Sequence, residues 1–273
     1  MDGEEINNYV YENNILTVQN VTGNVIIEKK SVCDQLSGDK NTPGSEYECE
    51  VKPGVKYNFY VLSNESDGTT NLIMNQNIYS DGTPSGMNAV TQESNEEKYS
   101  LIEWNLSGSN NDGPITAINF LYNATKDWVN IPPLNYSYMD KEFQETTATN
   151  TRYTSFISNN GVATITSLSG NIEVISSETI PLRARMPIYY ANPDKGIYKG
   201  ELLDKNENNS NAYLYANLDP AGSKPNGYWS LSSYQRDPER AWVVCYTYKI
   251  QISKTNFQNT YGVRPVINLY LNK

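Results

Sequence analysis

The C-terminal stretch "GYWSLSSYQRDPERAWVVCYTYKIQISKTNFQNTYGVRPVINL" (residues 227–269) decides how this chain folds. Its alternating apolar residues predict a β-hairpin that turns near residues 247–249, followed by a closing strand around residues 263–267. Trp229 and Trp242 are large enough to anchor a core from opposite sides, and each indole N–H needs a hydrogen-bond partner. The pattern therefore predicts that the end of the chain builds part of the core.

An arginine interrupts the apolar closing strand. The sequence Tyr-Gly-Val-Arg-Pro-Val at 261–266 contains Arg264, which we expect to be buried, with its five N–H donors satisfying loop carbonyls. The alternative is that Arg264 contacts a ligand. Pro265 cannot donate a ladder hydrogen bond, so this strand should lie at a sheet edge or a bulge. We therefore expect Trp229, Trp242 and Arg264 to have structural roles.

Composition excludes several classes of function. The chain has 273 residues, enough for one large domain or two small ones with a substantial core. It contains no histidine, which removes Ser-His-Asp and Cys-His nucleophile systems and most zinc and non-haem iron sites. The net charge of −10 and the pI of about 4.6 argue against nucleic acid or an anionic membrane surface as a partner.

No segment predicts membrane insertion. The longest apolar run is "AWVVCY" at 241–246, whereas a spanning helix needs about 20 apolar residues. The opening "MDGEEINNY" does not have the pattern of a signal peptide. The 22 tyrosines and the many asparagines are favoured at adaptable binding surfaces, although an AT-rich genome gives the same asparagine bias.

The chain as a whole has the pattern of an α+β protein. Apolar periodicity predicts one main helix over about 113–128, stopped by the prolines at 132–133, and a short helix near 211–218. Residues 1–30 form an N-terminal extension with the first short strands, and residues 31–273 a single domain. Further strands, and a β insert at 140–180, are predicted from alternation and turn residues at 14–21, 23–30, 54–63, 69–78, 100–108 and 180–190.

The three cysteines divide into a candidate pair and a single residue. Cys33 and Cys49 bracket a turn-rich loop, and a disulfide between the two strands that it joins would imply an oxidising compartment. The alternative is two free thiols. Cys245 has no histidine or second cysteine near it in the sequence, so we do not expect it to be a nucleophile.

The motifs Gly-Tyr-Trp-Ser (227–230), Ala-Trp-x-Val (241–244) and Tyr-Gly-Val-Arg-Pro-Val (261–266) resemble those of C-type lectin-like domains. These are bacterial and phage domains related to the formylglycine-generating-enzyme fold. Two branches are similar, the variable proteins of diversity-generating retroelements and the surface or pilin-like proteins of gut Firmicutes. The resemblance covers roughly 45–135 and 180–270, and it implies mixed antiparallel sheets around one main helix.

In the variable proteins, the face between the Trp-Ser strand and the Arg-Pro strand is the ligand surface. The candidate ligand contacts are the side chains that the predicted hairpin leaves pointing outward, namely Tyr234, Gln235, Arg236, Glu239, Arg240, Val243, Cys245, Thr247, Tyr248, Lys249, Gln251, Ser253, Lys254 and Asn256. The two arginines and two lysines suit an acidic or carbohydrate partner, and the alternative is an ordinary solvated rim. A lone exposed Cys245 is also a residue that retroelement mutagenesis samples.

The resemblance implies a non-enzymatic adhesion or display protein without a metal or cofactor. Its ligand would be a protein or carbohydrate on another cell or particle, and its location a bacterial cell surface, the extracellular space or a phage particle. One alternative is a structural pilin-like subunit that forms an oligomer or filament. Another alternative is a carbohydrate-active enzyme that uses Glu103 as one of its carboxylates. Glycosidases need two carboxylates about 5–9 Å apart. The related copper oxidase uses a cysteine pair, which the C-terminal motif lacks.

Overall fold

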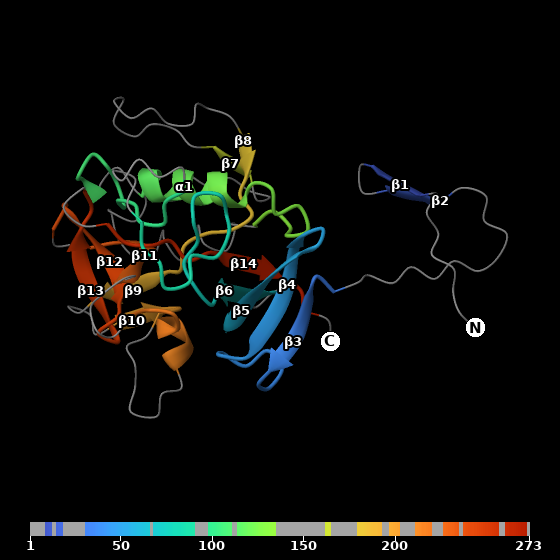
Figure 1. Cartoon of the computed structure of the whole chain (residues 1–273), viewed down its shortest axis with the longest axis horizontal. Coiled ribbons are helices and arrows are strands. Elements are labelled where there is room, and N and C mark those ends of the chain that lie inside the picture. The colour runs from blue at the N-terminus through green and yellow to red at the C-terminus, as the bar shows by residue number, and fades with distance from the viewer. Residues whose placement is uncertain are drawn as a thin grey trace. The chain divides into compact units, whose positions relative to one another are not determined.

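The computed structural model divides the chain into two compact units, Met1–Ser31 and Val32–Lys273 (Figure 1). This division falls next to the boundary at residue 30 expected from the sequence. The structure describes residues 9–12, 15–18, 31–65, 68–90, 98–110, 114–134, 162–164, 179–192, 197–202, 211–219, 226–234, 237–256 and 260–271.

The first unit contains a two-stranded antiparallel ribbon. Strand β1 (Tyr9–Glu12) pairs with β2 (Ile15–Val18), with Tyr9 opposite Val18. Strand β2 lies within the strand predicted at 14–21. The strand predicted at 23–30 lies outside the described residues.

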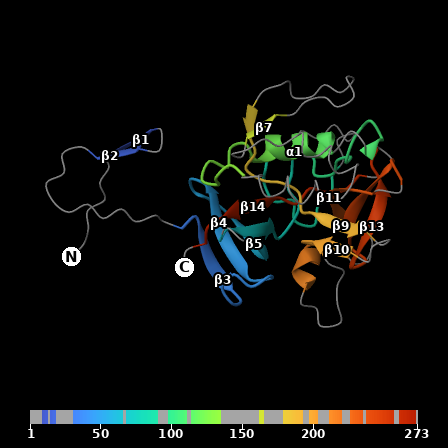
Figure 2. The ribbon, with the colours of Figure 1, turned by 180° about the vertical axis from the view of Figure 1, so that it is seen from behind.

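A five-stranded antiparallel sheet forms the first half of the second unit. Its order is β14-β6-β5-β4-β3, so the last strand of the chain joins the sheet beside β6 (Figures 1 and 2). Val266 lies opposite Ile73 in this pairing. The strands are β3 (Cys33–Ser37), β4 (Glu46–Lys52), β5 (Val55–Asn64), β6 (Thr70–Met74) and β14 (Val266–Leu269).

The remaining described elements of the second unit lie between β6 and β14 in the chain. A three-stranded antiparallel sheet has the order β11-β12-β13, and two further ribbons pair β7 with β8 and β9 with β10. The helix predicted at 113–128 is α1, and the short helix near 211–218 is the 3₁₀ turn η6. Their bounds are α1 (Ile115–Thr125), β7 (Val162–Thr164), β8 (Thr179–Pro181), β9 (Tyr189–Asn192), β10 (Ile197–Gly200), η6 (Ala212–Tyr215), β11 (Gly227–Ser233), β12 (Arg240–Cys245) and β13 (Lys249–Lys254).

The second unit is therefore α+β and mostly sheet, with two main antiparallel sheets and one described α-helix. Of the predicted β insert at 140–180, only β7 and the start of β8 lie within the described residues. They form the antiparallel pair Val162–Thr164 with Thr179–Pro181.

Strand β5 explains why the second unit has two clusters of buried apolar residues. Alternate side chains of a strand point to opposite faces. Phe59 and Val61 pack into the larger cluster with Trp104, Trp128 and Trp229, as the predicted alternation at 54–63 requires. The residue after Val61, Leu62, packs into a smaller cluster. This cluster also contains residues of η6, β11, β12 and β14, namely Leu214, Tyr215, Tyr228, Val244 and Val266.

The strand predicted at 100–108 does not form. Only an isolated bridge between Ile102 and Tyr261 is present there. The chain turns at Asn105, whose side-chain oxygen accepts a hydrogen bond from Ser107 N at 2.9 Å, and this local alternative ends strand pairing.

The strand predicted at 180–190 is likewise interrupted. It separates into β8 and β9, and between them Arg185 makes one antiparallel bridge with Val266. The Arg185 side chain is buried and forms an ion pair with Glu201, so this stretch serves a polar cluster rather than a continuous ladder.

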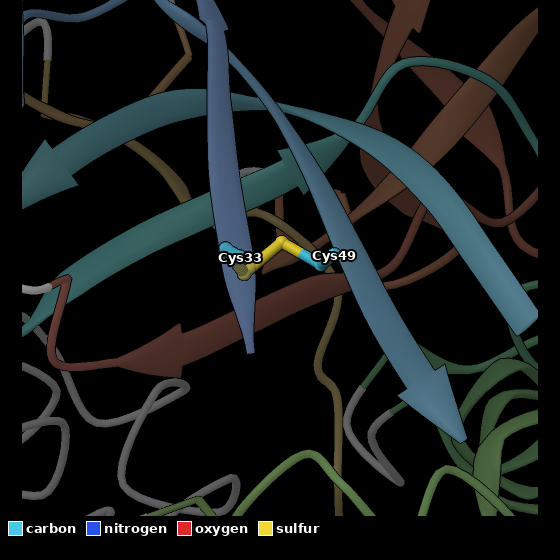
Figure 3. The surroundings of a disulfide bond; sticks show 2 residues. All are labelled: Cys33 and Cys49. Atoms are coloured by element: carbon cyan, nitrogen blue, oxygen red, sulfur yellow. A yellow bond between two sulfur atoms is a disulfide. The ribbon is translucent and has the colours of Figure 1, made fainter. Parts of the chain in front are cut away.

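The structure contains the Cys33–Cys49 disulfide that the sequence indicated. The two residues lie opposite one another on β3 and β4, and Figure 3 shows the bond crossing directly between these strands. Both cysteines are buried in the larger apolar cluster. The bond therefore fastens β3, which pairs only with β4 among the described strands, to the rest of the sheet.

Reducing this disulfide is expected to lower the free energy of unfolding by about 3 kcal/mol, because the bond restricts a loop of about 15 residues in the unfolded chain. Urea unfolding of the oxidised protein and of the reduced, alkylated protein measures the difference. Both samples carry Cys245→Ala, so that only the Cys33–Cys49 pair differs. An unchanged midpoint and slope would show that the bond does not contribute to stability.

Candidate ligand-binding surface

The register of the three-stranded sheet decides which C-terminal side chains can meet a ligand. Trp229 lies opposite Val243, and Val243 opposite Gln251, so these three side chains share one face. On this face Trp229 and Val243 are fully buried in the larger apolar cluster. The other face carries Trp242 and Ile252, which are opposite one another and only half-buried.

Two predicted ligand contacts, Val243 and Cys245, are therefore wrong. Both are buried, at 0% and 5% exposure, in the cluster that contains Trp229. The sequence pattern predicts that Trp242 points into the core and that its neighbour Val243 points outward. In the structure the two orientations are reversed. Burial also raises the pKa of the Cys245 thiol to about 11. Cys245 is thus neither a ligand contact nor a residue sampled on an exposed face.

The other predicted contacts fall into four groups. Arg236, with its neighbour Gln235, lies outside the described residues. Ser253 is buried. The exposed residues are Glu239, Thr247, Tyr248, Lys249 and Gln251, and the half-buried residues are Tyr234, Arg240, Lys254 and Asn256.

Three aromatic rings meet on the outer face of the sheet. Trp242 contacts Tyr189 of β9 with ring centroids 4.6 Å apart, and Tyr234, just after β11, with centroids 5.4 Å apart. Both contacts are edge-to-face, the arrangement that the ring quadrupoles favour. All three side chains are half-buried. We call Tyr189, Tyr234 and Trp242 the aromatic trio.

Two cations flank the aromatic trio. Arg240 and Lys254 lie directly opposite one another on β12 and β13, two register positions from Trp242 and Ile252 and therefore on the same face. The Nε of Arg240 donates to Asp237 Oδ2 at 2.9 Å, and each of these two side chains is 37% exposed. Among the described residues, the Nη groups of Arg240 have no protein acceptor.

The hairpin tip adds a second aromatic contact. The turn predicted near 247–249 lies one residue earlier, at Tyr246–Tyr248, with Tyr248 N donating to Cys245 O at 3.0 Å. Tyr248 has the left-handed φ of 62°, which is uncommon for a bulky residue. Its exposed ring packs edge-on against Tyr215 of η6 with centroids 5.5 Å apart.

Arg264 has the structural position expected for it. It is 1% exposed, and its two Nη groups donate to Leu214 O at 3.1 Å and Ala216 O at 2.8 Å in and after η6. The guanidinium carbon also lies 4.2 Å from the centroid of the Tyr228 ring. Burial lowers the pKa of Arg264, although the nearby Tyr228 raises it. Arg264 therefore holds η6, which supports Tyr248, against the closing strand.

Asn110 fixes the loop between β11 and β12, and nothing in the sequence pointed to it. Its side chain is 2% exposed. The Nδ2 group lies 2.9, 2.8 and 2.7 Å from the carbonyl oxygens of Tyr234, Asp237 and Arg240. Asn110 lies between the strand predicted at 100–108 and the helix predicted at 113–128, where the sequence assigned no role to it. One buried amide therefore gathers the backbone that carries the exposed charges.

Replacing Asn110 with alanine is expected to loosen the 234–240 loop and to lower the free energy of unfolding by about 1–3 kcal/mol, because Tyr234 O loses its donor and the carbonyls of Asp237 and Arg240 keep only their backbone donors. Amide exchange is compared with that of the wild type. Exchange that is faster in peptides covering residues 237–240, and less affected in the other peptides, would report the loop specifically. The control is Asn123→Ala on α1, where the side chain is exposed. Equal exchange in both variants would mean that Asn110 does not hold the loop.

Two described carboxylates, Glu65 and Glu201, take part in one hydrogen-bond cluster. Glu65 and Glu201 both accept from Asn71 Nδ2, and the Glu201 contact measures 3.2 Å. Glu201 also accepts from Arg185 Nη1 at 2.7 Å and from Ile188 N at 3.0 Å. These contacts make Glu201 the centre of a buried structural cluster. Glu103, the carboxylate expected of an enzyme, is half-buried.

Within the described ranges, no group of three or more His, Cys, Asp or Glu side chains is placed to hold a metal ion. No described helix has the length and apolar character needed to cross a bilayer. The sequence matches no family model, no curated protein and no solved structure.

Proposed function

We propose that this chain is a non-enzymatic ligand-binding module for adhesion or display, and that it binds through its C-terminal face. This face comprises the aromatic trio, Arg240, Lys254 and the hairpin tip at 246–249. The observation that carries the proposal is the aromatic trio, which stays partly exposed beside two cations on a sheet whose other side is buried. Aromatic residues and arginine are the side chains that anchor binding surfaces most often.

The C-type lectin-like fold is part of this proposal. The last strand returns to β6 early in the chain, and the β11–β12–β13 sheet lies between them in sequence. The Trp-Ser and Arg-Pro motifs at 229–230 and 264–265 are buried. These features support a lectin-like domain that presents its C-terminal hairpin.

Display outside the cytoplasm of a bacterium, or on a phage particle, is supported by the disulfide. Cys33 and Cys49 are buried and bonded, and such bonds persist in oxidising compartments.

A separate proposal is that this chain descends from a diversified variable protein. Val243 and Cys245 do not support it, because both side chains are buried. A reverse transcriptase gene with a near-copy of the 3′ end next to this gene would support it.

Binding of the labelled protein to intact bacterial and epithelial cells, measured by flow cytometry, tests the proposed function. The double variant Arg240→Ala/Tyr248→Ala is expected to reduce cell binding at least tenfold without a change in Tm, since the Arg240 side chain and Tyr248 are each 37% exposed and neither belongs to an apolar cluster. The control double variant is Lys56→Ala/Tyr270→Ala. It removes one cation and one tyrosine, 48% and 58% exposed, from the five-stranded sheet and the residue that follows it.

The control variant is expected to bind as the wild type does. Equal binding by both double variants, or no binding of the wild type to any cell type, would contradict the proposed function. The filament alternative predicts instead that the purified protein polymerises, which electron microscopy would reveal.

A further inference from the structure

We propose that the ligand of the C-terminal face is a carbohydrate that bears a carboxylate, with a sugar ring on Trp242 and the carboxylate between Arg240 and Lys254. This inference rests on the proposed function and adds the chemical class of the ligand.

The aromatic trio offers a surface of the size of a sugar ring. The C–H groups of a pyranose form a small apolar patch that an aromatic ring can cover, while its hydroxyls remain available for hydrogen bonds. Trp242 is half-buried between two tyrosines that contact it at 4.6 and 5.4 Å. Contact with the two tyrosine rings therefore holds the Trp242 ring in one orientation.

The two cations indicate an anionic group on that sugar. Arg240 and Lys254 lie directly opposite one another on β12 and β13, so both can approach one anionic group. Asp237 accepts from Nε of Arg240, and the planar guanidinium can still bind a carboxylate with its outer edge. This local positive charge contrasts with the net charge of −10 of the chain, so it selects an acidic ligand by charge complementarity.

A small apolar footprint favours a carbohydrate over a protein partner. Protein interfaces bury about 800 Å² on each side around large aromatic or aliphatic anchors. Among the described residues of the three-stranded sheet and its turns, Tyr248 is the one large apolar side chain that is more than a third exposed. The other aromatic residues of this face are recessed, which suits one or two sugar rings better than a broad protein surface.

The frame is also fixed before the ligand arrives. Asn110 holds the carbonyls of Tyr234, Asp237 and Arg240, and Trp242 is paired with Ile252 of β13. A rigid site loses less conformational entropy when it binds, which is important for a ligand as small as an oligosaccharide.

Protection of Trp242 from acrylamide quenching tests this proposal. The chain has four tryptophans, and Trp104, Trp128 and Trp229 are fully buried, so external quenching in the folded protein reports Trp242. The probes are oligosaccharides that contain glucuronate, galacturonate or N-acetylneuraminate, with neutral glucose and galactose oligosaccharides of the same length. We expect at least one acidic probe to reduce quenching and to bind at least tenfold more tightly than its neutral counterpart.

Three variants separate the contributions in calorimetric titrations. Arg240→Gln and Lys254→Gln are each expected to weaken binding of the acidic probe at least fivefold and to leave the weak binding of the neutral probe unchanged. Lys56→Gln on the other sheet is expected to have no effect. Trp242→Ala should abolish binding of both probes, with the near-ultraviolet circular dichroism of the buried tryptophans retained.

Equal affinity for acidic and neutral probes would overturn the assigned charge, and binding that survives Trp242→Ala would overturn the assigned site. If no sugar binds or competes, while cell binding is still lost in Arg240→Ala/Tyr248→Ala, a protein ligand is indicated; the carbohydrate inference then fails and the proposed function stands. If cell binding is also unaffected by that double variant, the proposed function fails as well.

Discussion

Replacing Arg264 with alanine is expected to lower the free energy of unfolding by about 3–5 kcal/mol. The substitution removes the donor of Ala216 O and one of the two donors of Leu214 O, which keeps the Tyr228 hydroxyl at 2.8 Å, and it leaves an empty space beside Tyr228, over whose ring the guanidinium lies. Each buried carbonyl without a donor costs about 1–3 kcal/mol, and the cavity adds to this cost. Urea unfolding followed by tryptophan fluorescence measures the loss.

Two further substitutions show what Arg264 contributes. Arg264→Met fills the space without hydrogen bonds and is expected to recover the cavity contribution alone. Arg264→Lys keeps the charge but cannot reach two carbonyls with the same planar fork, and it should remain destabilised by about 2 kcal/mol or more. If Arg264→Ala unfolds at the wild-type urea concentration, the guanidinium does not fasten η6, and the inferred support for Tyr248 is wrong.

Replacing Trp229 with alanine is expected to lower the free energy of unfolding by about 3–5 kcal/mol as well, the usual cost of removing a buried indole. Trp229 is 0% exposed. Its indole N–H donates to Ile102 O at 2.8 Å, and its ring contacts Tyr261 with centroids 4.9 Å apart. The substitution therefore removes the side-chain contacts of β11 with the bridge between Ile102 and Tyr261, while the backbone bridge between Tyr228 and Gly262 remains.

The matched control is Trp242→Ala, which removes the same side chain from the neighbouring strand. Because Trp242 is half-buried, its loss should reduce stability less than half as much as the loss of Trp229, while it removes ligand binding. Comparable destabilisation by the two substitutions would mean that Trp242 is a core residue and that the C-terminal face is assigned to the wrong side of the sheet.

Part of the candidate site was predictable from the sequence. The alternation of side chains along a strand predicts the hairpin, its turn, the burial of Trp229 and the exposure of Tyr248. Because an unpaired buried charge is costly, a buried Arg264 was expected to bind loop carbonyls. The orientation of β12 was not predictable. Its sequence "RAWVVC" carries apolar side chains on both faces, so alternation shows which residues share a face without showing which face is covered.

Asn110 shows the limit of sequence patterns more sharply. Its partners lie more than a hundred residues further along the chain, and a buried asparagine in a polar loop has no local pattern that distinguishes it from an exposed one. The aromatic trio has the same origin, because Tyr189 reaches Trp242 from β9, a strand of another sheet.

The sequence by itself determined the α+β class, the main helix, the Cys33–Cys49 pairing as one of two alternatives, and the buried role of Arg264. These features depend on the periodicity of the sequence and on the chemistry of residues that lie close together in it. The tertiary structure decided that Val243 and Cys245 are buried and that Trp242 faces outward between two tyrosines. That choice depends on which distant elements cover each side of the sheet, and only the packing of the whole second unit determines this.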